Sequence, residues 1–200
     1  DDSVALRRVL ARARLGDRSA GVRAEGARAL DAMRRASPDD HPSRIAAGDA
    51  WLHAGRPDRA LQAYGEGEGS KLVQRKAAAL LAMGQYTRAA KVAPAAVPDG
   101  CRIAATPVAC ALGLADMGFP IAAADRLDRE LRNRHATLRT RAERAAGHGT
   151  LGTLQARAGR PDRAIRAWQS SLANQPSDSV RRKLVDALLA DGQIATARRY

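Results

Sequence analysis

The chain has 200 residues and a mass of 21.2 kDa, a length suited to one domain. Alanine and arginine fill 75 positions (45 and 30), whereas phenylalanine, tryptophan and tyrosine together fill six. Because aromatic and β-branched residues favour strands, this composition predicts an all-α fold. A hydrophobic content of 45% suffices for a core and excludes wholesale disorder. No apolar run approaches the roughly 18 residues of a membrane-spanning helix, so we expect no membrane insertion within this segment.

The charge balance is strongly basic, with 34 basic against 21 acidic residues and a net charge of +13. Such a surplus can indicate nucleic acid, an anionic polysaccharide or an acidic protein surface as the partner. Residues 125–144 are the densest stretch, with seven arginines against four acidic residues. We favour a solvated helix surface there, because arginines and acids can pair along the helix. Nucleic acid is less favoured, because this stretch lacks aromatic residues for base stacking.

An internal repeat organises the chain. Glycine followed five positions later by alanine recurs five times, at intervals of 29, 34, 41 and 33 residues between the glycines. The pairs are Gly55 with Ala60, Gly84 with Ala89, Gly118 with Ala123, Gly159 with Ala164, and Gly192 with Ala197. A constant motif at such spacing is the signature of a helical repeat protein.

Each copy of the motif predicts a turn between two helices. Glycine suits the end of the first helix because it adopts the left-handed conformation without a steric penalty. The copies at 55–60 and 159–164 both read Gly-Arg-Pro-Asp-Arg-Ala, and proline is well placed in the first turn of the second helix. The small alanine lets the two helices approach closely. A large residue four positions later, Tyr64, Leu127 or Trp168, is expected to fill the space beside it.

The expected architecture is an α-solenoid of about five to six antiparallel helix pairs within one domain, residues 1–200. The predicted pairs are 2–15 with 19–36, 42–54 with 57–65, 70–83 with 86–93, 106–117 with 120–134, 136–158 with 161–174, and 178–190 with 193–199. Irregular connectors are expected near 65–70, 93–105 and 135–145. Pro94 interrupts the second helix of the Gly84 copy, and Ala93 stands there in place of a large residue.

Residues 145–178 resemble a tetratricopeptide repeat over its whole length. The matching positions are Leu151 and Gly152 in the first helix, Gly159 at the turn, Ala164 and Trp168 in the second helix, and Pro176 at its end. Gly48 and Trp51 occupy the equivalent first-helix positions before Gly55. The resemblance implies a right-handed superhelix whose concave face binds a protein partner as an extended peptide or a helix.

The repeat register assigns polar residues to that concave groove. The partner-binding candidates are Asp49, His53, Lys71, Gln74, Asp116, Thr153, Arg157, Arg182 and Asp186. Between these residues lies a sparse apolar floor. Because the groove is not conspicuously charged, we expect most of the basic surplus on the convex face.

Motifs for catalysis are missing from the sequence. The four histidines are scattered without metal-ligand spacing, and there is no nucleophile motif and no phosphate-binding loop. We therefore expect no enzyme activity, no cofactor and no metal. Cys101 and Cys110, nine residues apart, leave two alternatives open. They form either a disulfide, which indicates an oxidising compartment, or a pair of small buried thiols.

The sequence thus predicts a non-catalytic scaffold for protein–protein interaction. Similar arginine- and alanine-rich repeat arrays form the periplasmic arm of bacterial outer-membrane proteins that export poly-N-acetylglucosamine or cellulose, and of related phage receptors. That resemblance implies a periplasmic segment of a longer chain, in contact with a partner protein or a polysaccharide. One alternative is direct binding of an anionic polymer, either acidic polysaccharide or nucleic acid. Another is a cytoplasmic adaptor or secretion chaperone.

Overall fold

The computed structural model describes residues 11, 14, 19–36, 40–66, 69–97, 101, 106–133, 138 and 140–200. Within these residues every regular element is a helix, which confirms the all-α class. The elements are α2 (Ala20–Ala36), α3 (His41–His53), α4 (Pro57–Tyr64), α5 (Ser70–Ala82), α6 (Tyr86–Val92), the short 3₁₀ helix η1 (Pro94–Ala96), α8 (Pro107–Asp116), α9 (Pro120–Arg132), α10 (Arg141–Arg157), α11 (Pro161–Asn174), α12 (Asp178–Ala190) and α13 (Ile194–Ala197). No helix in these ranges is long and apolar enough to cross a membrane.

Most helix ends lie within a few residues of the predicted bounds. The largest difference is α10, which begins at Arg141 rather than near residue 136. A capping box sets this start: Thr140 accepts from the backbone N–H of Glu143, and the Glu143 carboxylate accepts from the N–H of Thr140. Residues 141–145, the last part of the connector predicted at 135–145, therefore belong to α10. The predicted helix over 2–15 and residues 134–137 and 139 lie outside the described residues, apart from Ala11 and Arg14.

The five repeat glycines end the first helix of each pair in the left-handed conformation. Their φ angles are +75° at Gly55, +77° at Gly84, +95° at Gly118, +70° at Gly159 and +74° at Gly192. The alanines five positions later are all buried, with exposed fractions of 0–5%. Proline begins the next helix at Pro57, Pro120 and Pro161. Glycine is required at these turns because other residues adopt this backbone at a cost.

Two helix pairs cross with an aromatic ring packed directly on a glycine. A Cβ atom on Gly48 would come 2.1 Å from the ring of Tyr64, and a Cβ on Gly152 would come 2.4 Å from Trp168. In both copies the packed glycine lies seven residues before the turn glycine, and the aromatic residue lies nine residues after the turn glycine. Two other pairs place Ala111 with Leu127, and Ala77 with Ala93, at these two positions. In these two pairs alanine replaces the glycine, and the residue opposite is smaller than an aromatic ring.

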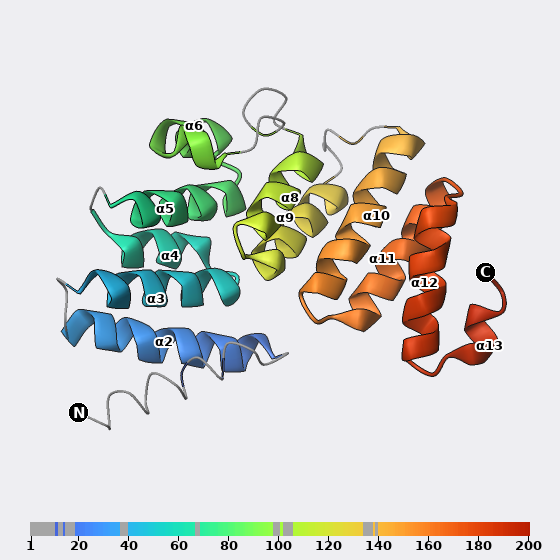
Figure 1. The fold of residues 1–200 in the computed structure, drawn as a ribbon, viewed down its shortest axis with the longest axis horizontal. Coiled ribbons are helices and arrows are strands. Elements are labelled where there is room, and N and C mark those ends of the chain that lie inside the picture. The colour runs from blue at the N-terminus through green and yellow to red at the C-terminus, as the bar shows by residue number, and fades with distance from the viewer. Residues whose placement is uncertain are drawn as a thin grey trace.

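Most helices that are neighbours in sequence are also neighbours in space, as Figure 1 shows, with an exception between α6 and α8. Helices α2 to α5 lie side by side, α10 to α12 form a second group, and α8 and α9 lie between the two groups. The short helix α6 packs mainly against α5 and η1, and α5 makes direct contact with α8 and α9. The direction of the helix axes changes at this junction (Figure 1). Pro94 explains the short α6, because it cannot donate the backbone hydrogen bond that a continuing helix needs.

A disulfide joins Cys101 to Cys110 next to this junction. The two Cα atoms are 4.8 Å apart, and both side chains are buried. Cys101 belongs to the connector after η1, whereas Cys110 lies in the first turn of α8. The bond therefore ties Cys101 to the helix on which the second half of the chain begins. Residues 98–100 and 102–105 of the predicted connector lie outside the described residues.

Candidate functional site

An open groove runs between α10, α11 and α12. Its volume is about 480 Å³, and three segments line it: one face of α10, the end of α11 with the following turn, and the start of α12. The lining residues are Ala142, Ala145, Ala146, Gly149, Thr150, Thr153, Ser171, Gln175, Pro176, Ser177, Val180 and Lys183. Small residues recur on α10 every three or four positions, so they lie on the same face of the helix. Because their side chains are short, the groove stays open.

The floor of the groove is held in place by local contacts. The hydroxyl of Ser171 donates to the carbonyl of Ala145 at 2.7 Å, and this bond ties α11 to α10. A Cβ on Gly149 would come 3.3 Å from Ser171 Oγ and 3.4 Å from a methyl group of Val180. Ser177 caps α12 by accepting from the N–H of Val180. These contacts hold α10, α11 and α12 against one another at the floor of the groove.

The groove is weakly polar and carries a single cation among its described lining residues. Lys183 Nζ donates to Thr153 Oγ1 at 3.4 Å, and Thr153 Oγ1 donates to the carbonyl of Gly149. The remaining polar groups are hydroxyls of threonine and serine and the amide of Gln175. No lining residue is an acid, a histidine or a cysteine. This surface offers hydrogen bonds and close backbone approach, which suits an extended peptide.

The structure distributes the nine residues predicted for the groove over several places. Thr153 lines the groove between α10 and α12. Arg157 pairs with Asp116 at 3.2 Å and donates to the carbonyl of Ala115, so these side chains join α10 to α8. The other exposed candidates are Lys71, Gln74, Arg182 and Asp186. Asp49 and His53 are only partly exposed and have partners inside the protein.

Asp49 belongs to a polar cluster formed by α3, α4 and α5. The Tyr64 hydroxyl donates to Asp49 Oδ1 at 2.7 Å, and Arg75 Nε lies 3.3 Å from the same oxygen. Burial raises the pKa of Asp49, because the charged carboxylate loses water; the Tyr64 hydrogen bond and the charges of Arg75, His53 and Lys71 oppose this increase. Burial of the charged Asp49 carboxylate therefore costs free energy, and the Tyr64 hydrogen bond and the nearby positive charges reduce that cost.

His53 and Phe119 extend this cluster to the junction with α9. The two rings are 5.5 Å apart, and the Arg75 guanidinium lies 4.8 Å from the centre of the Phe119 ring. Arg75 also donates to the carbonyl of Met117 at 2.8 Å. Burial lowers the pKa of His53; the charge of Asp49 opposes this decrease, and Arg75 with Arg23 adds to it. No sequence motif marks Arg75 and Phe119, because the two residues meet across 44 positions.

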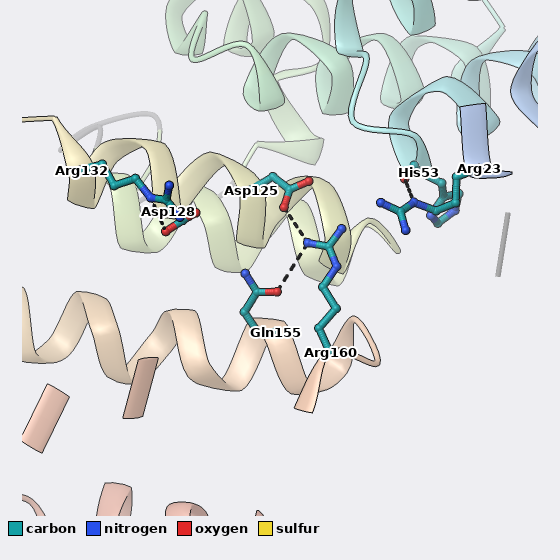
Figure 2. Close-up of polar contacts among 7 residues, drawn as sticks. All are labelled: Arg23, His53, Asp125, Asp128, Arg132, Gln155 and Arg160. Atoms are coloured by element: carbon teal, nitrogen blue, oxygen red, sulfur yellow. Dashed lines mark hydrogen bonds and ion pairs between the residues drawn. The ribbon is translucent and has the colours of Figure 1, made fainter. Parts of the chain in front are cut away.

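Arginines from neighbouring helices cap the ends of several helices. Arg23 donates to the carbonyl of His53, the last residue of α3, at a distance of 3.1 Å (Figure 2). The same contact joins Arg44 to Tyr64, the last residue of α4, and Arg129 to Ala82, the last residue of α5. Carbonyls at a helix end lack partners within the helix, and a cation also favours that end of the helix dipole. Part of the arginine surplus is therefore structural.

Arginines in the stretch after residue 125 also have partners within the protein. Arg126 donates to the Tyr86 hydroxyl at 2.9 Å and pairs with Glu130. Arg132 pairs with Asp128 at 2.7 Å, four residues before it on α9, as Figure 2 shows. Arg134 and Arg139 lie outside the described residues. These pairs agree with a helix surface on which arginines and acids neutralise one another.

Comparison with known proteins returned no match to any protein-family model or to any curated protein. Among the described residues, no three His, Cys, Asp or Glu side chains lie close enough to hold a metal ion.

Proposed function

We propose that this chain is a non-catalytic scaffold of the tetratricopeptide type, in which helix pairs form a solenoid that binds a segment of a partner protein. The groove between α10 and α12 carries this proposal. It is open and lined by small residues with hydroxyl and amide groups, as a site for an extended chain requires. The recurring turn glycines and the two glycine–aromatic crossings support the solenoid.

The partner is proposed to be an extended peptide rather than a helix. Ser177 and Gln175 adopt extended backbone conformations beside the groove, and Lys183 at its rim can pair with an acidic side chain. An extended segment uses such exposed polar groups along its whole length, whereas a helix needs a wide apolar strip. The described lining residues offer one aliphatic side chain larger than alanine, Val180, besides the ring of Pro176.

The compartment proposed is the bacterial periplasm, within an outer-membrane export assembly. The disulfide between Cys101 and Cys110 supports an oxidising compartment, since such bonds persist there and are rare in the cytoplasm. Cell fractionation tests this part: the protein is expected with the envelope and without free thiols. A cytosolic protein with two reactive thiols would contradict it and favour an adaptor or chaperone in the cytoplasm.

Blocking the groove tests the scaffold itself. Ala146 lines the groove and is exposed, so Ala146→Trp fills the groove without displacing buried atoms. Ala156 is exposed on the same helix outside the groove, and Ala156→Trp is the matched control. Proteins that co-purify from the producing cells are expected to be lost with Ala146→Trp and kept with Ala156→Trp. Equal recovery with both variants would contradict binding in this groove.

A further inference from the structure

A second cavity lies where the turn between α3 and α4 faces the turn between α10 and α11. Its volume is about 390 Å³, and it shares no lining residue with the groove between α10 and α12. The lining residues are Arg23, Ala54, Gly55, Asp125, Gly159, Arg160, Pro161, Asp162, Arg163 and Arg166. Gly55 and Gly159 are the first residues of the two identical Gly-Arg-Pro-Asp-Arg-Ala segments, so the cavity brings the two identical turns together.

One wall of the cavity is a fixed ion pair. Arg160 Nη1 donates to Asp125 Oδ1 at 2.6 Å, and Gln155 Oε1 lies 3.5 Å from the same nitrogen (Figure 2). The Arg160 side chain is 11% exposed, which holds this guanidinium in place. The pair is neutral overall and forms a polar surface between α9 and α11.

The other charges in the cavity are mostly positive. Arg163 and Arg166 lie three residues apart on α11, both are exposed, and neither forms an ion pair with a described residue. Arg23 is 4% exposed and is anchored through its contact with the carbonyl of His53. Among the described lining residues, four guanidinium groups and two carboxylates, those of Asp125 and Asp162, give a surplus of two positive charges.

Such a surplus in a recess attracts anions. Charges at a concave, partly desolvated surface are less screened than charges on a flat surface. A guanidinium group presents paired donors that match the oxygens of a phosphate or a carboxylate. The cavity volume lies in the range of about 300–1,000 Å³ that is typical of small-molecule sites, so it has room for more than a single ion.

We propose that this cavity binds the oxyanion of a small ligand, a phosphate or a carboxylate, with Arg163 and Arg166 as the pairing groups. Arg23 contributes positive charge from the inner wall. The carboxylate of Asp162 favours a ligand that carries a hydroxyl or ammonium donor beside its oxyanion. The lining residues come from α2, the turn after α3, α9, and α11 with the turn before it. A bound ligand therefore ties the first half of the chain to the second. This site is independent of the proposed peptide groove.

Titration with simple oxyanions tests the proposal. Inorganic pyrophosphate and malonate are added separately at constant ionic strength, and the amide resonances of Gly55 and Gly159 are followed by NMR. We expect a saturable shift of both resonances with at least one probe. Pyrophosphate alone would assign a phosphoryl ligand, malonate alone a carboxylate ligand, and both probes an oxyanion of either kind.

Paired variants separate a site from general charge attraction. Arg163→Gln with Arg166→Gln is expected to weaken binding at least tenfold. Arg141→Gln with Arg198→Gln removes two exposed arginines elsewhere and is expected to leave binding unchanged. Equal weakening by both double variants would overturn the proposal, as would the lack of a saturable shift with either probe.

Discussion

The indole of Trp168 lies against the backbone of Gly152, where a Cβ atom would come 2.4 Å from the ring. This contact fixes how closely α10 and α11 cross. Gly152→Ala must therefore displace the ring or separate the helices, and we expect a loss of about 1–3 kcal/mol in the free energy of unfolding. Urea unfolding followed by circular dichroism measures the loss. No loss would mean that the ring does not set the crossing distance.

Two further variants identify the cause of that loss. Gly159→Ala meets no atom within 4 Å, so it costs only the strain of a left-handed backbone, about 1–2 kcal/mol. Gly152→Ala with Trp168→Leu recreates the combination found at Ala111 and Leu127. The double variant is expected to be less destabilised than the sum of its single changes, by about 0.5–3 kcal/mol. Simple additivity would contradict the complementarity of size.

The stability of the fold is expected to fall through His53 as the pH decreases below about 6.5. Its folded pKa lies below the ordinary value of 6.5, so the folded protein binds this proton less tightly than the unfolded chain does. The stabilisation is fully present above pH 6.5 and is lost as the pH falls through the folded pKa. His53→Gln should reduce the dependence of Tm on pH over this range.

The measurement of Tm against pH needs controls, because Asp49 and His148 also have shifted pKa values. Burial raises the folded pKa of Asp49, so its contribution is lost as the pH rises and opposes that of His53. The comparison is therefore repeated in an Asp49→Asn background. His148 has a pKa that burial lowers in the same direction, whereas His41 is exposed. An equal effect of His41→Gln and His53→Gln would contradict the assignment.

Tyr64→Phe is expected to shift the titration of Asp49. The Tyr64 hydroxyl donates to the Asp49 carboxylate at 2.7 Å, which lowers the carboxyl pKa against the effect of burial. Loss of this bond should raise the pKa of Asp49 further and destabilise the fold by about 1–3 kcal/mol. The carboxyl carbon of Asp49 reports the shift by NMR. An unchanged titration would show that the bond is not formed in solution.

Reduction of the disulfide is expected to weaken the junction between the two halves of the chain. Cys101→Ser with Cys110→Ser should cost roughly 2–3 kcal/mol, the value expected for a closed loop of about ten residues. A reducing agent should have the same effect on the original chain and none on the double variant. Equal stability of the oxidised and reduced proteins would contradict a structural role for the bond.

Much of the fold could be predicted from the sequence because turn chemistry is local. Glycine, proline and alanine at fixed offsets placed the ends of α3, α4, α8 and α11 within one or two residues. The direct packing of α8 on α5 could not be predicted in this way. It follows from the short α6 and from contacts such as Arg75 with Phe119, which join residues far apart in the sequence.

The candidate site was less accessible to sequence analysis than the fold. The repeat register predicted Thr153 and Asp49 for one concave groove. Thr153 lines the groove between α10 and α12, whereas the carboxylate of Asp49 has partners on α4 and α5. The repeat register predicts only which face of a helix a residue lies on. Whether a groove forms at that face depends on which neighbouring side chains are small. The recurrence of Ala142, Ala146 and Gly149 on α10 was the available signal for that groove.

Site-specific photo-crosslinking in the producing cells tests the proposed scaffold most directly. A photoreactive residue is placed at Ala146 or Lys183 in the groove, and at Ala156 or Gln62 on exposed helix surfaces outside it. The account predicts that both groove positions crosslink to one partner through the same short segment, and that neither control position does. Adducts at the control positions alone, or groove adducts that map to unrelated segments, would contradict it.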